Sequence, residues 1–144
     1  MIAIGSDHAW FHLKQEVIKH LEARGIAYQD FGTYTADSCH YVTFAEKVAH
    51  AVADQSCEKG ILICGTGVGM SMAANKVKGI RAACCSDHFS AKATRQHNNA
   101  NILCFGERVV GAGVANELVD LFLDTPYEGG RHQIRVDMIS ELEK

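Results

Sequence analysis

Several features that define other protein classes are missing from this chain of 144 residues. No apolar run approaches the roughly 18 residues that a membrane-spanning helix needs. Residues 1–7 have neither the basic start nor the long apolar stretch of a signal peptide. Lys and Arg number 14 against 17 Asp and Glu, and they are scattered. This charge argues against a nucleic-acid or membrane partner, and we expect a cytoplasmic protein.

Metal-binding and disulfide motifs are also missing. Neither Cys-x-x-Cys nor His-Glu-x-x-His occurs, so a structural zinc site is not expected. Six cysteines could form disulfides, but without an export signal reduced thiols are the better interpretation. We expect Cys57, Cys84, Cys85 and Cys104 to be small buried hydrophobes.

The chain does contain a regular alternation of short apolar runs and amphipathic segments. The runs predict strands at residues 2–4, 26–31, 60–64, 80–85 and 101–105. Apolar residues at helical spacing predict helices after each strand, and a last helix follows the only proline, Pro126. The order predicts one domain over residues 1–144, an α/β/α three-layer sandwich with a five-stranded, mainly parallel Rossmann-like sheet. Ligands in such domains bind at the carboxyl ends of strands.

The segment 64–69, Cys-Gly-Thr-Gly-Val-Gly, directly follows the third predicted strand. Alternating glycines let the backbone turn tightly and direct several N–H groups to one point, and the start of a helix adds positive character. Cys64 is therefore a candidate base or nucleophile beside an anion site. A small buried hydrophobe, the commoner fate of a free cysteine, fits the same position.

Three further polar segments each allow two interpretations. Residues 5–8, Gly-Ser-Asp-His, fit a site at a strand end or a turn with a helix cap. Residues 95–99, Arg-Gln-His-Asn-Asn, offer a histidine for proton transfer or a helix C-cap. Arg131 and Arg135 share one helix face and suit a phosphate dianion or a solvated surface. Arg108, just after the fifth strand, is another candidate.

Together and in this order, the four segments resemble the ribose-5-phosphate isomerase B family, which includes galactose-6-phosphate and allose-6-phosphate isomerases. The motifs that carry the resemblance are Gly5–His8, Gly60–Gly69, Arg95–Asn98 and Gly129–Val136. It implies an enzyme that needs no metal or cofactor and interconverts ribose 5-phosphate and ribulose 5-phosphate through a cis-enediol(ate). It also implies a homodimer or tetramer with active sites between subunits, and a C-terminal helix at about 131–143 that contacts the partner.

The resemblance assigns roles to matching positions. Cys64 would move a proton between C1 and C2 with the assistance of Thr66, and His97 with Asp7 would open the sugar ring. The enediolate would be stabilised by the amides of Gly65, Gly67, Val68 and Gly69. Phosphate would be bound by His8, Arg108, Arg131 and Arg135, and sugar hydroxyls by Asn98 and Tyr41. These roles agree with the chemistry, because removing a proton next to a carbonyl needs a base and a group of donors for the oxyanion.

One departure from the family and three alternatives accompany this interpretation. Val42 stands where the family often has proline after tyrosine, which bears on the shape of residues 33–41 and on Tyr41. A hexose-6-phosphate isomerase, for allose or galactose phosphate, would carry the same motifs. A non-catalytic sugar-phosphate sensor is the alternative from another class, because fold alone does not determine function. A thiol-redox module is a third, weakened by the lack of Cys-x-x-Cys.

Overall fold

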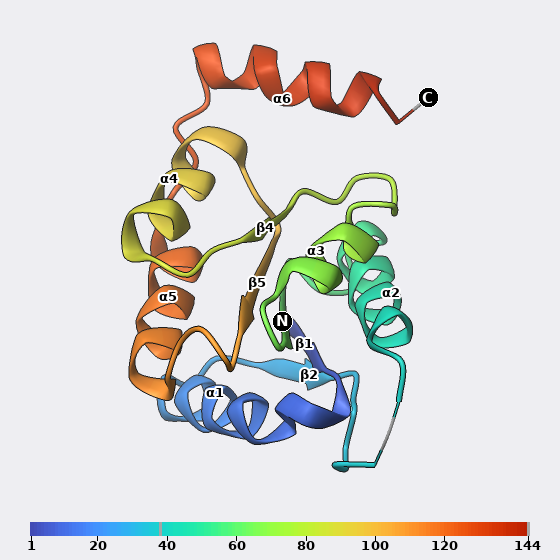
Figure 1. Ribbon diagram of the computed structural model, residues 1–144. Coiled ribbons are helices and arrows are strands. Elements are labelled where there is room, and N and C mark those ends of the chain that lie inside the picture. The colour runs from blue at the N-terminus through green and yellow to red at the C-terminus, as the bar shows by residue number, and fades with distance from the viewer. Residues whose placement is uncertain (38, 144) are drawn as a thin grey trace.

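The computed structural model describes residues 1–37 and 39–143, and every structural statement below concerns these residues. They form a parallel sheet of five strands in the order β2-β1-β3-β5-β4 (Figure 1). The strands are β1 (Ile2–Ser6), β2 (Tyr28–Asp30), β3 (Lys59–Cys64), β4 (Ala82–Cys84) and β5 (Ile102–Gly106). The predicted five-stranded sheet is confirmed, and it is entirely parallel.

Helices cover both faces of the sheet (Figure 1). They are α1 (Phe11–Ala23), α2 (Tyr41–Ala53), α3 (Val68–Ala74), α4 (His88–Asn98), α5 (Ala112–Asp124) and α6 (Arg131–Glu141), with a 3-10 turn η1 (His8–Trp10) before α1. Buried side chains of α1, α4 and α5 pack on one face, and those of α2 and α3 pack on the other. The three-layer α/β/α architecture predicted from the alternating pattern is therefore confirmed.

The central strand β3 shows why its sequence is continuously apolar. Ile61 and Ile63 point into the cluster formed with α1 and α5, whereas Leu62 and Cys64 point into the cluster formed with α2 and α3. Both faces are covered, so no position on the strand favours a polar side chain. Cys64 consequently ends the strand on the α2–α3 side of the sheet.

The strand order changes direction at β1, which lies between β2 and β3. The connections that follow β1 and β3 therefore lead to opposite sides of the sheet and leave a crevice at the carboxyl ends of these two strands. In this register Ser6 pairs with Ile63, and Cys64 pairs with Gly106 of β5. The segments 5–8 and 64–69 therefore meet at one edge, as expected for a ligand site.

The largest differences from the predicted elements occur at the sheet edges. β2 and β4 have three residues each and are shorter than the apolar runs 26–31 and 80–85. An edge strand has hydrogen-bonding partners on one side only, so its pairing ends before the apolar run does. The same edge position leaves Cys84 exposed, and the expectation that it is buried was wrong. Cys57, Cys85 and Cys104 are buried as expected.

The segment between β2 and α2 is attached to the body by a buried lysine. The ammonium of Lys14, fully buried on α1, donates to Asp30 Oδ1 at 2.6 Å and to the carbonyl of Thr33. Burial lowers the pKa of Lys14, and the hydrogen bond and charge of Asp30 oppose that effect. α2 begins at Tyr41, slightly before the apolar pattern predicted, so Tyr41 lies in its first turn.

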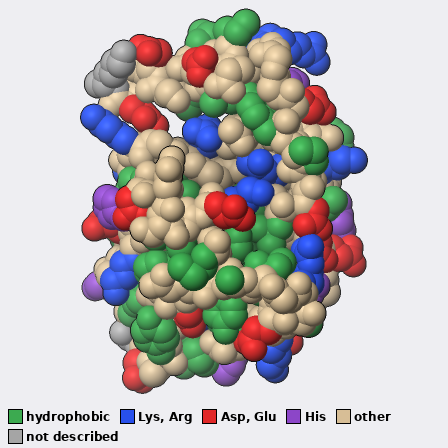
Figure 2. All heavy atoms as spheres, turned by 180° about the vertical axis from the view of Figure 1, so that it is seen from behind, with side chains coloured by type: hydrophobic (Ala, Val, Ile, Leu, Met, Phe, Trp, Pro, Cys, Tyr) green, Lys and Arg blue, Asp and Glu red, His purple; other side chains and the backbone are tan. Residues whose placement is uncertain are grey.

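Helix α6 lies across the amino ends of the strands, apart from the two helical layers (Figure 1). Val136 is its buried residue, while Ile134, Met138 and Leu142 are exposed by 65%, 63% and 83%. A hollow of about 620 Å³ lies between α6 and the body, with Lys76, Lys78 and Arg81 among its lining residues. Figure 2 shows Lys and Arg side chains gathered beside this hollow. None of the described helices is both long and apolar enough to cross a membrane.

Candidate active site

The loop after β3 holds the Cys64 thiol against a backbone donor. The Gly67 N–H donates to Cys64 Sγ at 3.0 Å, and the side chain is buried. The carbonyls of Cys64 and Gly65 accept the N–H groups of Glu107 and Arg108 at 3.0 and 3.2 Å. The sulfur of Cys64 therefore has a fixed position at the end of β3, beside the backbone donors of the loop.

Close packing on the end of β5 explains the glycines of this loop. Gly67 has a φ of +86°, and a Cβ there would lie 2.8 Å from the backbone of Phe105. A Cβ on Gly106 would collide with the backbone of Gly65 and Thr66. The loop therefore requires glycine both for its conformation and for its contact with β5.

Thr66 and Tyr41 border the same loop. The exposed Thr66 accepts the Val68 N–H at 3.2 Å through Oγ1, which organises the start of α3. A Cβ on Gly69 would lie 2.8 Å from the ring of Tyr41, so that ring packs directly against the loop. Tyr41, the predicted sugar contact, thus lies against the loop that Cys64 begins.

The segment after β1 supplies a buried carboxylate. Asp7 Oδ1 is buried and has no hydrogen-bond partner within residues 1–37 and 39–143. Burial raises the pKa of Asp7, while the charge of His8 and N–H groups of Ala9 and Trp10 oppose the rise. His8 is itself oriented, because its Nδ1 accepts the Cys39 N–H at 3.2 Å. A carboxylate in this state can accept a proton, or a hydrogen bond from a hydroxyl group of a ligand.

Trp10 also belongs to this end of the sheet, although the sequence pattern assigned it only to a helix. A Cβ on Gly65 would lie 3.0 Å from its ring, and the Arg108 guanidinium lies 4.9 Å from the ring centroid. The available signal was a lone tryptophan three residues after Asp7 at a strand end. This signal did not lead to a prediction, because an apolar residue at the start of a predicted helix needs no functional explanation.

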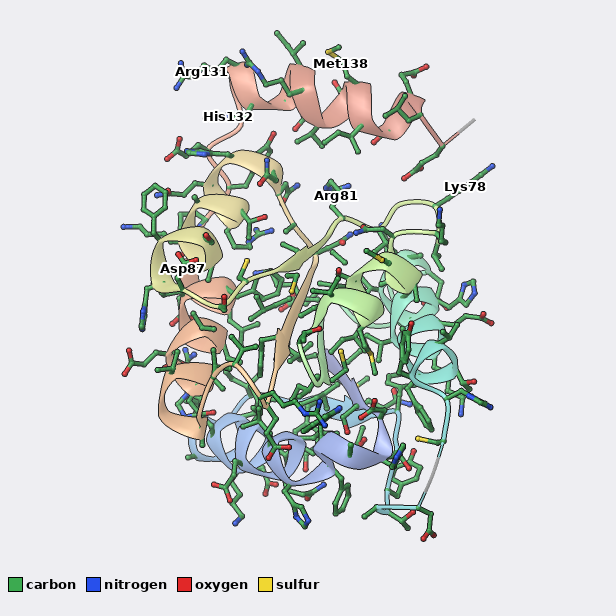
Figure 3. The ribbon with its side chains drawn as sticks, in the orientation of Figure 1. Lys78, Arg81, Asp87, Arg131, His132 and Met138 are labelled. Carbon is green, nitrogen blue, oxygen red and sulfur yellow. The ribbon has the colours of Figure 1, made fainter. Side chains whose placement is uncertain are left out.

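A second group of predicted residues gathers where α4 meets α6. His97, Asn98, Arg131 and Arg135 line a hollow of about 420 Å³. Arg131 and His132 project from the first turn of α6 (Figure 3). Arg135 Nη1 donates to the carbonyl of Arg131 at 3.0 Å, which confirms that the two arginines share one helix face.

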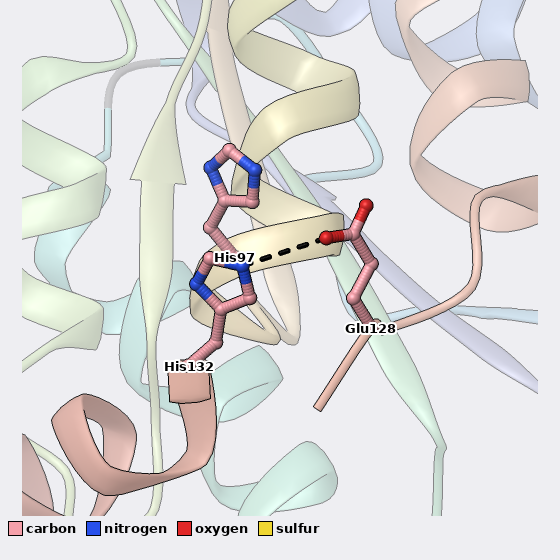
Figure 4. Close-up of side chains that lie close together, drawn as sticks. All are labelled: His97, Glu128 and His132. Atoms are coloured by element: carbon pink, nitrogen blue, oxygen red, sulfur yellow. Dashed lines mark ion pairs between the residues drawn. The ribbon is translucent and has the colours of Figure 1, made fainter. Parts of the chain in front are cut away.

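Two stacked histidines distinguish this second group. The rings of His97 and His132 lie 4.5 Å apart with an interplanar angle of 18°. His132 Nε2 lies 3.4 Å from Glu128 Oε1, as the dashed line in Figure 4 marks. The sequence motifs had not assigned a role to His132 or Glu128. His132 stands next to Arg131 within the Gly129–Val136 motif, so its position was the signal that could have found it.

Two imidazoles and a carboxylate are also a donor set that zinc binds. The ligand atoms of His97, Glu128 and His132 all lie within 4.8 Å of one another. However, rings stacked nearly parallel do not direct their nitrogens to a common point. Arg131 and Arg135 line the same hollow, and their charge favours an anion over a cation.

The two groups lie at opposite ends of the sheet within one chain. Cys64 ends β3, whereas His97 lies in the last turn of α4, which leads into the amino end of β5. Five residues of β5 separate these edges by roughly 15 Å. Figure 3 shows α6, with Arg131 and His132, on the far side of the sheet from α1. The structure thus brings the predicted residues together in two places and not in one.

Comparison with known proteins identifies the family. Residues 2–139 match the model of the Ribose/Galactose Isomerase family. The chain belongs to this family. It is 51% identical to ribose-5-phosphate isomerase B of Escherichia coli over 143 residues, which cover 99% of this chain and 96% of that protein. It is 41% identical to D-erythrulose-4-phosphate isomerase of Pectobacterium atrosepticum, with 99% and 94% covered.

A solved relative has the same fold as this member of the Ribose/Galactose Isomerase family. The ribose-5-phosphate isomerase B of Clostridium thermocellum superposes with a TM-score of 0.97 at 51% identity, covering 99% of this chain and 96% of that one. The family predicted from the four motifs is confirmed, and the chain is an isomerase. The roles of individual residues stay predictions.

Proposed function

We propose that this isomerase interconverts ribose 5-phosphate and ribulose 5-phosphate through a cis-enediol(ate). The observation that carries the proposal is the Cys64 thiol at the end of β3, with the Gly67 N–H donating to its sulfur at 3.0 Å. This places a candidate base beside backbone donors, which is what enolisation of a sugar phosphate requires. Membership of the Ribose/Galactose Isomerase family supports the reaction class.

In this proposal the proton transfer takes place on the open-chain form of the aldose. The Cys64 thiolate takes the proton from C2, and the electron pair moves to form the C1–C2 double bond and a negative O1. N–H groups of residues 65–69 stabilise that oxyanion, and those of Gly67 and Val68 exchange their present acceptors, Cys64 Sγ and Thr66 Oγ1, for it. The Cys64 thiol then returns a proton to C1, while the O2 proton moves to O1, which gives the ketose. Thr66, at the rim of the loop, assists the base.

Ring opening precedes this step, because the sugar arrives mostly as a ring. In our proposal His97 exchanges protons with the ring oxygen and the C1 hydroxyl, and Asp7 acts with it. The unpartnered, buried Oδ1 of Asp7 supports a role on a ligand hydroxyl. Replacing His97 with Asn should therefore slow turnover of ring substrate more than turnover of an open-chain substrate, and equal losses would contradict the assignment.

Substrate binding is assigned to the two groups of polar residues. Phosphate is held by His8, Arg108, Arg131 and Arg135, and the sugar hydroxyls by Asn98 and Tyr41. A phosphate remote from the reacting carbons provides binding energy that orients C1 and C2 at the base. The hollow lined by Arg131 and Arg135 supports this assignment, since it combines two guanidinium groups with two imidazoles.

We further propose that residues 1–144 form one isomerase domain that works as a homodimer, or a tetramer built from it. Cys64 and His97 lie at opposite ends of the sheet, so a complete site needs two copies of the chain. The exposed apolar side chains of α6, including Ile134 and Met138, supply a surface for the partner. The six free cysteines support a cytoplasmic, reducing location.

A hexose 6-phosphate is the competing substrate, because the family that matches this chain is described as Ribose/Galactose Isomerase. The test is kcat/KM measured side by side on ribose 5-phosphate, allose 6-phosphate and galactose 6-phosphate. We expect ribose 5-phosphate to give the highest value. A higher value for either hexose would replace the proposed substrate. Saturable binding of a sugar phosphate without turnover would indicate a sensor instead.

A further inference from the structure

Trp10 contacts two parts of the candidate site at once. It is the only tryptophan in the chain, and it is partly buried at the end of η1. Its ring packs against both buried clusters, one on each face of the sheet. The ring also lies against Gly65, where an added Cβ would approach it to 3.0 Å. The indole therefore has a fixed position beside the loop that carries Cys64.

The second contact is with Arg108. Its guanidinium carbon lies 4.9 Å from the centroid of the Trp10 ring, which is cation–π distance. The backbone N–H of Arg108 donates to the Gly65 carbonyl, so this residue is attached to the same loop. No carboxylate in the described chain pairs with the exposed Arg108 guanidinium. The indole face thus holds the cation without using its N–H donors, which leaves them for an anion.

We propose that Trp10 is a positioning residue for the isomerisation: its indole holds the Arg108 guanidinium beside the Cys64 loop, ready for the substrate phosphate. This inference rests on the proposed function for the phosphate assigned to Arg108. A flexible arginine must lose side-chain freedom when it binds phosphate, and a preformed contact reduces that loss. Trp10 should accordingly act on substrate affinity through Arg108 and not on the proton transfer.

The kinetic test is a double-mutant cycle with Trp10→Leu and Arg108→Gln. Because the Trp10 side chain also hydrogen-bonds Asp7, which is assigned to ring opening, the cycle is measured on an open-chain substrate. There we expect Trp10→Leu to raise KM about tenfold while kcat changes by less than about twofold. Trp10→Phe, which keeps an aromatic face, should recover most of the loss. In the Arg108→Gln background, Trp10→Leu should add nothing further. An unchanged KM, or the same rise in KM in both backgrounds, would overturn the inference. Phe89→Leu, which removes an exposed aromatic from α4, is the matched control.

A fluorescence titration decides the question even if Trp10→Leu does not fold. Because Trp10 is the only tryptophan, emission excited at wavelengths beyond the tyrosine absorption band reports its surroundings alone. Inorganic phosphate should change that emission saturably, and Arg108→Gln should remove the response. An emission that phosphate leaves unchanged, or a response that survives in Arg108→Gln, would contradict the role of Trp10. Absence of turnover on any sugar phosphate would instead contradict the proposed function, so the two failures are distinguishable.

Discussion

Lys14, which is buried, and Asp7, which has one buried oxygen, have opposite surroundings. Lys14 donates to both Asp30 and the Thr33 carbonyl, so its charge is compensated where it is buried. Asp7 has a buried Oδ1 without a partner in the described structure. Compensated burial is typical of a structural residue, whereas a buried carboxylate oxygen without a partner at a strand end costs stability and is typical of a functional one.

This contrast predicts a trade-off at Asp7. Burial raises the pKa of Asp7, so the folded protein holds this proton more tightly than the unfolded chain does. The stabilisation is present at low pH and is lost as the pH rises through the raised pKa, which leaves a destabilising carboxylate at neutral pH. Asp7→Asn should therefore raise the free energy of unfolding by about 1 kcal/mol at pH 7. It should also lower kcat about a hundredfold.

Urea unfolding at several pH values measures the stability effect. The difference between Asp7→Asn and the unmodified protein should shrink as the pH falls and Asp7 becomes neutral. Asp54→Asn is the matched control, because hydrogen bonds from Ser56 lower the pKa of this exposed carboxylate and its loss should not stabilise. An Asp7→Asn variant that is less stable at pH 7, with unchanged activity, would contradict the interpretation.

The loop from β3 to α3 is the element on which the site depends most directly. Gly67 combines a left-handed backbone with a Cβ position only 2.8 Å from the Phe105 backbone. Gly67→Ala should lower the free energy of unfolding by about 3 kcal/mol, because both the backbone and the contact with β5 must shift. The Gly67 N–H that donates to Cys64 would move as well, so kcat should fall more than KM rises.

Gly113→Ala provides the comparison within the same fold. Gly113 lies in α5, and a Cβ there would meet no atom within 4 Å. This substitution should raise the free energy of unfolding by about 0.5 kcal/mol, because alanine loses less backbone freedom in a helix. Equal effects of the two substitutions in urea unfolding would show that the loop does not require glycine at position 67.

Hydrophobic periodicity predicted the helices and strands well where other elements pack on both sides of a segment. Residues 60–64 are apolar throughout because helices pack on both faces of β3, and the structure confirms this strand. At β4 the apolar run 80–85 continues beyond the pairing, since an edge strand has one neighbour. The helix was predicted from Phe44 onward, whereas α2 begins at Tyr41, because its first three residues are exposed and do not belong to the buried stripe.

The sequence predicted which residues belong to the candidate site, but not how they are arranged in space. The four motifs indicated Cys64, His97 and the arginine pair, and the structure places them at element ends, while their roles stay predictions. The stacking of His97 on His132 depends on how α6 crosses the end of α4, which no local pattern encodes. The contact of Trp10 with Arg108 likewise joins residues about a hundred positions apart.

The separation of Cys64 from His97 has a consequence for the assembled enzyme. If each site combines the Cys64 end of one chain with the His97 end of another, two different inactive variants should complement each other. Mixing Cys64→Ala with His97→Asn, unfolding and refolding together, should restore about a quarter of the wild-type activity, because half of the dimers are mixed and each has one intact site of two.

The control for this experiment is each variant refolded alone, which should stay inactive. Refolding Cys64→Ala with a Cys64→Ala, His97→Asn double variant should also restore nothing, since no site then has both groups. If the mixed sample stays as inactive as its parents while forming the expected dimers, the site lies within one chain and the two-chain proposal is contradicted.

The central claim is that Cys64 transfers a proton between C1 and C2 of an aldose phosphate. The most direct measurement is nuclear magnetic resonance of ribose 5-phosphate incubated with the enzyme in deuterium oxide. We predict deuterium at C1 of the ribulose 5-phosphate formed, loss of this exchange in Cys64→Ala with sugar-phosphate binding retained, and normal exchange after removal of the neighbouring exposed thiol by Cys84→Ala. Exchange at the wild-type rate in Cys64→Ala would contradict the claim.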